Sequence, residues 1–173
     1  MLTLNQLVNI VSFDTNVMKN TKGFTLIELL IVIVIISILA AIIYVAVDPA
    51  TRFGDARNAR RRSEVVSVLN AVLKYQVDNN GSLPAGIDVV TGTSQVLGTA
   101  GSGCDLTCGA TTTVAACLNM TATLVDTYLA SIPMDPSSGT AANTDYYLNR
   151  TTSGRLLVGA CDPENGASIS VTR

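Results

Sequence analysis

An acidic side chain stands inside an apolar stretch near the start of the chain. Glu28 is followed by 19 uncharged residues (29–47) before the next charge, Asp48, and an α-helix needs ~20 apolar residues to cross the hydrocarbon core of a bilayer. A carboxylate in such surroundings is costly unless it finds a partner. The type and position of Glu28 therefore predict charge pairing as its chemistry.

Cysteine is the second residue type that could form a bond. The chain has four cysteines and no Cys-x-x-Cys pair, which disfavours zinc and thioredoxin-like sites. If the cysteines lie outside the cytoplasm, disulfides are expected, and each bridge stabilises a small core by ~2–4 kcal/mol. Of the three possible pairings we favour Cys117 with Cys161 and Cys104 with Cys108, and buried free thiols are the alternative.

Catalytic and phosphate-binding patterns are absent from the sequence. There is no histidine, no Gly-x-Ser-x-Gly elbow and no glycine-rich loop followed by Lys-Ser/Thr. The formal charge is −2, or −3 without residues 1–23, so the overall charge gives no indication of a nucleic-acid binder. We therefore predict no catalytic residue and no cofactor, and a membrane-anchored enzyme or binding protein is a remote alternative.

One long helix is predicted to position Glu28, from Phe24 to about Asn79. The run Leu30–Ile36 is apolar on every face, as lipid or a bundle of like helices requires. A proline removes one helical hydrogen bond, so a kink or local melting is expected over Val45–Pro49. Asn79-Asn80-Gly81 supplies a left-handed exit that ends the helix.

The second half of this helix carries a largely apolar stripe and a basic segment. Residues at three- and four-residue steps form the stripe and can hold a small domain; they are Val65, Leu69, Val72 and Gln76, flanked by Val66, Leu73 and Val77. Four arginines precede the stripe: Arg57, Arg60, Arg61 and Arg62. They are expected either to pair with neighbouring subunits or phosphates, or to form a solvated or headgroup-facing surface.

The residues around Glu28 carry a family resemblance. The sequence Gly23-Phe24-Thr25-Leu26-Ile27-Glu28-Leu29, followed by a β-branched apolar run, resembles the N-terminal signature of type IV pilins and type II secretion pseudopilins. The resemblance implies a cut by prepilin peptidase between Gly23 and Phe24, N-methylation of Phe24, and contact of Glu28 with a neighbouring subunit's amino terminus. Family members usually have proline at the position of Val45, so detailed filament geometry is not carried over.

Residues 1–23 are predicted to be a leader that is removed. Met18–Gly23 is a complete short basic leader by itself, which indicates Met18 as the start of translation, and a genuine long leader is the alternative. The resemblance implies a single-pass precursor in the inner membrane with a cytoplasmic N-terminus, and a periplasmic or extracellular filament after assembly. The arginines that follow the apolar run would predict the opposite orientation by a count of positive residues.

The rest of the chain is predicted to form an α+β head with a small antiparallel sheet of about three strands packed on the stripe. Residues 85–119 have no sustained period and are interpreted as a loop, and a short helix is expected at Thr123–Leu129. Strands are predicted at Tyr146–Arg150 and Arg155–Ala160, joined by a glycine-containing turn, and at Ser168–Thr172.

Oxygen-bearing side chains precede the first of the two hairpin strands. Asp135, Asn143 and Asp145 carry the ligand atoms that calcium prefers. The resemblance adds that the corresponding loop binds calcium in some pseudopilins. Their spacing is unspecific, so a polar, solvated loop is the favoured interpretation.

These elements divide the chain into four segments: the leader 1–23, the transmembrane and assembly helix 24–48, its amphipathic continuation 49–80 and the head 81–173. The resemblance implies a structural subunit of a pilus-like filament, a homo-oligomer whose partners are the membrane, prepilin peptidase and inner-membrane assembly machinery. The alternative within the same class is the major pseudopilin of a type II secretion system.

Overall fold

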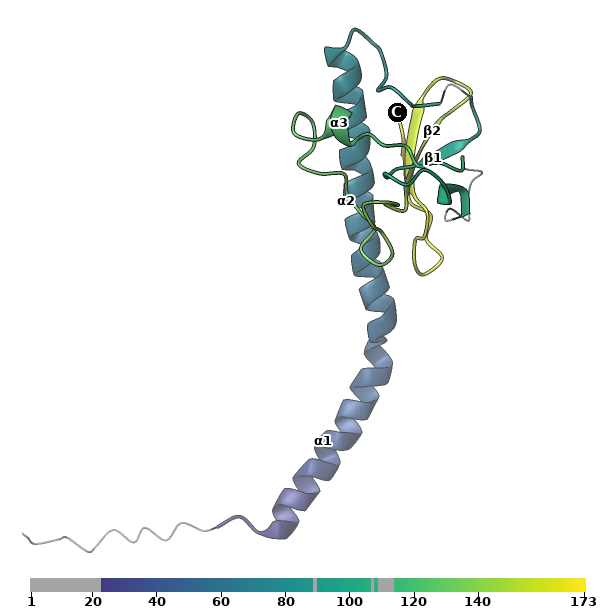
Figure 1. Cartoon of the computed structure of the whole chain (residues 1–173). Helices are drawn as coiled ribbons and strands as arrows, with labels where there is room; N and C mark the ends of the chain where they lie inside the picture. The colour runs from purple at the N-terminus through teal and green to yellow at the C-terminus, as the bar shows by residue number, and fades with distance from the viewer. Residues whose placement is uncertain (1–22, 89, 107, 109–113) are drawn as a thin grey trace, which may run out of the picture. The chain divides into compact units, whose positions relative to one another are not determined.

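The computed structural model describes residues 23–88, 90–106, 108 and 114–173. Apart from Gly23, the predicted leader lies outside the described residues. The chain divides into two compact units, with the boundary between Val47 and Asp48. Each unit is described by itself below (Figure 1).

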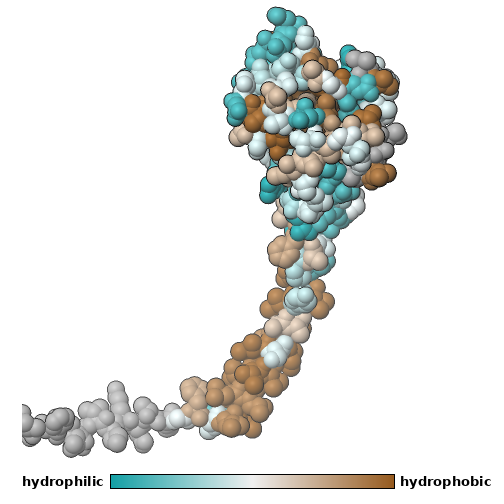
Figure 2. All heavy atoms as spheres, in the orientation of Figure 1, coloured by the Kyte–Doolittle hydropathy of each residue, from teal (hydrophilic) through white to brown (hydrophobic). Residues whose placement is uncertain are grey.

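The described residues of the first unit contain one helix, α1, at Leu26–Val47. Its surface is largely apolar (Figure 2), with Glu28 and Ser37 as the exceptions, and none of its residues is buried. The hydroxyl of Ser37 donates to the carbonyl of Ile33 at 2.7 Å, so this polar group is satisfied within the helix, as hydrocarbon surroundings require. By length and composition alone, the helical stretch Leu26–Asp78 includes a segment able to cross a membrane.

The helical hydrogen-bond pattern is interrupted at Asp48. This residue has a left-handed backbone with φ 42°, and Pro49 opens the next helix, α2, at Pro49–Asp78. A proline is tolerated there because the first helical N–H groups lack partners in any case. The predicted break at Val45–Pro49 is thereby confirmed.

Helix α2 begins the second unit and ends where the sequence predicts. Asn80 has φ 55° and Gly81 has φ 87°, and the N–H of Gly81 bonds to the carbonyl of Gln76 at 2.8 Å. This is the expected left-handed exit. Val65, Leu69 and Val72 are buried as predicted, whereas Val66 and Val77 are exposed. Val68 and Ala71 are buried instead, so the buried stripe is displaced from the predicted one.

The second unit also contains an antiparallel sheet in the order β1-β2-β3-β4. Its strands are β1 at Ser94–Val96, β2 at Tyr146–Arg150, β3 at Leu156–Ala160 and β4 at Ser170–Thr172. The α+β class and the β2–β3 hairpin are confirmed. The sheet has one strand more than the three located in the sequence, because β1 is only three residues long and lies in the segment interpreted as a loop.

Two short helices complete the second unit. η3 covers Cys104–Leu106 and α3 covers Thr121–Leu124. α3 thus begins two residues before the predicted helix Thr123–Leu129 and ends five residues before that helix does. It ends early because Asp126 turns to φ 70° and Val125 and Leu129 form an isolated bridge.

Both faces of the sheet are covered. Tyr146 and Leu148 join the apolar core against α2, whereas Tyr147 between them joins a second cluster that contains three of the cysteines. This alternation follows from the two-residue period of a strand. On the cysteine side, the ring of Tyr147 lies across Gly159 so closely that a Cβ there would be 2.5 Å from the ring, so this position requires glycine.

Candidate functional site: the N-terminal motif

The junction predicted to be cut is sterically open. Phe24 is 83% exposed, and a Cβ built on Gly23 would meet no other atom within 4 Å. Gly23 also lacks the positive φ that favours glycine elsewhere in the chain. Neither packing nor backbone conformation in this structure therefore explains glycine at position 23.

Thr25 and Glu28 form a reciprocal cap at the start of α1. The backbone N–H and the hydroxyl of Thr25 each donate to Oε2 of Glu28 at 2.8 Å, and the N–H of Glu28 donates to the Thr25 hydroxyl at 3.3 Å. This is the capping box, in which two side chains satisfy N–H groups that a helix start leaves unpaired. The spacing Thr-x-x-Glu carried this signal in the sequence, and our sequence analysis missed it.

The cap uses only one oxygen of the Glu28 carboxylate. Both donors of Thr25 reach Oε2, and no residue that the structure describes donates to Oε1. The negative charge of Glu28 has no ion-pair partner among the described residues either. The cap therefore leaves Glu28 able to accept a bond from a cation outside this chain.

Comparison with known proteins places this motif in a family context. The family model described as "Prokaryotic N-terminal methylation motif" matches residues 18–44. The curated protein "Type IV wide pilus major component PilA4" of Thermus thermophilus is 46% identical over 67 residues, which are 36% of this chain and 47% of that protein. The match thus spans about half the length of the relative. No solved structure matches the chain.

The chain is similar to a type IV pilin in the residues that are matched. The resemblance that the Gly23–Leu29 sequence indicated is thereby supported. The matched relative is named as the major component of a type IV wide pilus, a description that agrees with the prediction of a non-enzymatic chain.

The cysteines of the head form two disulfides, in a pairing that differs from the one we favoured. Cys104 bonds to Cys117 and Cys108 bonds to Cys161. The expected pairs Cys104–Cys108 and Cys117–Cys161 are therefore wrong, as is the alternative of free thiols. The long bridge joins the loop to the residue after β3, and the short one closes the loop that covers the second face of the sheet.

The arginines of α2 differ in their surroundings: Arg60 and Arg62 lie on the surface, as one of the two predictions has it, whereas Arg61 does not. Arg61 is 0% exposed, and its five N–H groups bond to Asp135, Glu164, Asn58 and Ser137. Neither a solvated surface nor a contact with a neighbouring subunit describes it. Arg60 pairs with Glu64 on the helix surface at 2.8 Å.

Asp135 accepts two of the five bonds of Arg61, more than any other partner. Its two oxygens accept from Nε and Nη2 of Arg61, at 2.5 and 2.8 Å, and Oδ1 also accepts from the N–H and hydroxyl of Ser137. Burial raises the pKa of the Asp135 carboxyl, but the hydrogen bonds from Arg61 and Ser137 outweigh it and lower the pKa to about 2. The guanidinium of Arg61 therefore occupies the place that a cation on Asp135 would need.

Two of the three calcium candidates, Asp135 and Asn143, already use side-chain oxygens in bonds within the fold. Asn143 uses its side-chain oxygen to accept the N–H of Asp145, and the structure shows no group of three or more acidic, histidine or cysteine ligands among the residues it describes. Asp135 and Asp145 are both only 4% exposed, so a solvated loop is also the wrong description of these two residues.

Glu164 joins the turn before β4 to α2. Its carboxylate accepts from Arg57 at 2.5 and 2.7 Å and from Arg61 at 2.9 Å. The side chain of Asn58 exchanges two bonds with the backbone of Glu164, at 2.8 and 3.0 Å. Hydrogen bonds from the two arginines lower the pKa of Glu164 to about 2. We call Arg57, Asn58, Arg61, Asp135 and Glu164 the arginine network. Sequence analysis missed it because its acidic members lie more than 70 residues from Arg61 in the sequence.

Proposed function

We propose that this chain is a structural subunit of a type IV pilus-like filament. The precursor enters the inner membrane with its N-terminus in the cytoplasm, is cut after Gly23, is N-methylated at Phe24 and polymerises through α1. The observation that carries the proposal is the apolar surface of α1, unburied throughout, with Glu28 at its start.

The physical argument is that α1 needs apolar surroundings at every stage. A helix that is apolar all round and 22 residues long fits the hydrocarbon core of a bilayer, and a bundle of like helices is the other medium that covers all its faces. Transfer from one medium to the other keeps the apolar surface out of water. Polymerisation through α1 is thus compatible with insertion in the membrane.

The motif supplies what processing and assembly require. Gly23 has no structural requirement for glycine in this chain, which is consistent with recognition by a peptidase that reads a small residue at the cut. Cutting frees an amino group at Phe24, which is the nearest cation that assembly of copies can supply to Oε1 of Glu28. A pair between subunits would neutralise a carboxylate that is otherwise costly among apolar helices.

Intact mass of the purified subunit tests the processing step. Cells that contain prepilin peptidase should yield a chain that begins at Phe24 and carries one methyl group, and cells without it should yield the uncut chain. Gly23→Leu should block the cut while leaving α1 unchanged. An uncut parent chain in cells with active peptidase would refute the proposal.

Electron microscopy of surface filaments separates the pilus from the alternative, the major pseudopilin of a type II secretion system. Filaments that react with an antibody to this chain at normal expression indicate a pilus. A chain that is cut and methylated but needed for export of a secreted protein, with no surface filament, indicates the pseudopilin.

A further inference from the structure

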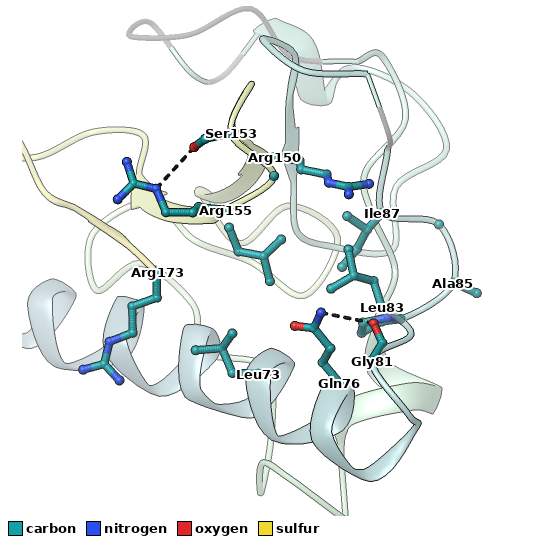
Figure 3. A pocket seen from close by; sticks show the side chains of 14 residues that line it. Leu73, Gln76, Gly81, Leu83, Ala85, Ile87, Arg150, Ser153, Arg155 and Arg173 are labelled. Carbon is teal, nitrogen blue, oxygen red and sulfur yellow. Dashed lines mark hydrogen bonds between the residues drawn. The ribbon is translucent and has the colours of Figure 1, made fainter.

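The head contains a groove of about 610 Å³ at the C-terminal end of α2. Its walls come from the last turns of α2, the 81–87 exit loop, the β2–β3 hairpin and the residue after β4. Figure 3 shows the guanidinium of Arg150 on the side of the groove where Ile87 lies, and those of Arg155 and Arg173 on the opposite side. We call this site the arginine groove.

The arginine groove is basic in a chain that is acidic overall. None of its 14 lining residues is Asp or Glu, and its three arginines form no ion pair with any residue that the structure describes. Arg155 makes one side-chain bond, to the hydroxyl of Ser153 at 3.3 Å. The arginines of α2 that face Glu64, Asp135 and Glu164 are neutralised within the fold, so this uncompensated charge indicates an anionic ligand.

The floor of the arginine groove indicates what carries the anionic groups. It is aliphatic, with Leu73, Leu83, Ile87 and Leu156, and no aromatic side chain lines it. Nucleic-acid bases bind to proteins largely by stacking on aromatic rings, and this surface offers none. Aliphatic side chains of a peptide match the floor, and carboxylates match the planar fork of arginine.

The adjoining edge of the sheet offers backbone hydrogen bonds. Leu156 and Arg173 exchange both N–H···O bonds, at 2.8 and 2.9 Å. In an antiparallel ladder such hydrogen-bonded pairs alternate with pairs that exchange no bond. Thr172, the residue before Arg173, therefore directs its N–H and C=O away from β3. β4 is at the edge of the sheet, and no described residue bonds to these groups. A peptide can add to such an edge, whereas a glycan or a duplex cannot.

We propose that the arginine groove binds an acidic peptide segment of a partner protein. Carboxylates of the segment pair with Arg150, Arg155 and Arg173, its aliphatic side chains cover the leucines, and its backbone continues the sheet beside β4. The proposal concerns the head alone and does not depend on filament assembly.

Fluorescence anisotropy with the intact mature chain in nonionic detergent tests the proposal. The probe is a labelled peptide of alternating aspartate and leucine. We expect saturable binding that weakens with salt, and the double variant Arg150→Ala/Arg155→Ala should weaken it about tenfold or more, since each charge-assisted bond is strong. Arg62→Ala is the matched control, because Arg62 is an exposed arginine on α2 that does not line the groove, and it should leave the affinity unchanged.

Further probes make the test decisive. The same peptide with asparagine in place of aspartate should bind much more weakly, and an N-methylated peptide should lose the contribution of the β4 edge. No saturable binding of the acidic peptide, or an equal loss in the Arg62→Ala control, would overturn the proposal. So would a sulfated glycan or a DNA duplex that binds through Arg150 and Arg155 where the peptide does not.

Discussion

Arg61 and Asp135 form an ion pair in which neither side chain is exposed, with 2.5 Å between Nε and Oδ2. The two residues are 74 positions apart, so the pair joins α2 to the loop that precedes β2. Every N–H of the guanidinium has an acceptor, which offsets the large desolvation penalty of a buried charge. The pair fixes one end of the head on the helix.

Removing one partner of this pair should be strongly destabilising. Arg61→Met leaves the Asp135 carboxylate buried without its cation and should lower the free energy of unfolding by about 3–5 kcal/mol. The double variant Arg61→Met/Asp135→Leu should recover most of that loss, because it leaves no unpaired charge. Chemical denaturation of the detergent-solubilised chain, followed by circular dichroism, measures both.

The matched control is Arg62→Met, at the exposed neighbouring position. It should change the free energy of unfolding by less than about 0.5 kcal/mol, as is usual for surface substitutions. Equal effects of the Arg61 and Arg62 variants would contradict the importance of the buried pair.

Stability should fall in acid because of the same network. The pKa values of Asp135 and Glu164 are both lowered to about 2 in the folded head, whereas carboxyls in an unfolded chain have pKa values of about 4. The unfolded chain therefore binds protons first as the pH falls, so the stabilisation is complete above about pH 5 and is lost toward pH 2. The contribution of Asp135 is on the order of 2 kcal/mol.

Unfolding measured at a series of pH values between about 7 and about 2.5 checks this prediction, since this range spans the two sets of pKa values. The double variant Arg61→Met/Asp135→Leu should have a flatter profile than the parent, because the titrating carboxyl and its cation are both gone. A parent whose stability is constant over the whole series would show that the network does not hold these carboxyls ionised.

The sequence predicts the local elements of this fold better than the contacts between them. The break near Pro49, the Asn80-Gly81 exit and the β2–β3 hairpin each depend on a few adjacent residues. Arg61, in contrast, has the same local surroundings as Arg60 and Arg62, and only the fold turns it toward Asp135. No periodicity within α2 distinguishes a buried arginine from an exposed one when its partner is 74 positions away.

The cysteines also show that the sequence does not predict contacts between distant residues. Sequence proximity favoured a bond between Cys104 and Cys108, but the structure bonds each to a more distant partner. The register of β2 and β3 places Tyr146 opposite Ala160, which brings Cys161 to the face that the loop covers. This register depends on the whole sheet, including β1, which has no signal of its own in the sequence.

The two disulfides should contribute unequally to stability. The Cys108–Cys161 bridge spans 53 residues and the Cys104–Cys117 bridge spans 13, and a longer closed loop restricts the unfolded chain more. Cys108→Ala/Cys161→Ala should therefore cost about 4 kcal/mol and Cys104→Ala/Cys117→Ala about 3 kcal/mol, by the chain-entropy model. Denaturation of the two double variants under non-reducing conditions compares them.

Digestion at Asp105 and within 109–116, followed by mass spectrometry without reduction, checks the connectivity. It should release one linked pair of peptides with Cys104 and Cys117, and another with Cys108 and Cys161. A peptide pair that links Cys117 to Cys161 would contradict the structure.

Glu28 caps α1 within the chain, and under the proposed function its charge also pairs with a partner outside the chain. The cap needs only an acceptor at this position, and glutamine serves as well as glutamate in a capping box. Pairing with a freed amino group needs the charge. Glu28→Gln should therefore keep α1 and the cut after Gly23, yet abolish filaments or reduce them greatly, and Glu28→Val should do the same.

Thr25→Ala is the complementary variant, because it removes the cap and keeps the charge of Glu28. Loss of a cap costs about 1 kcal/mol, which fraying of the first turn of α1 can absorb, so filaments should form in reduced but measurable amount. Sheared filaments counted by electron microscopy, with cut subunit in the membrane measured by mass spectrometry, compare all three variants. Glu28→Gln keeps the cap and loses the charge, whereas Thr25→Ala keeps the charge and loses the cap. If Glu28→Gln assembled like the parent while Thr25→Ala did not, capping rather than charge pairing would be the role of Glu28.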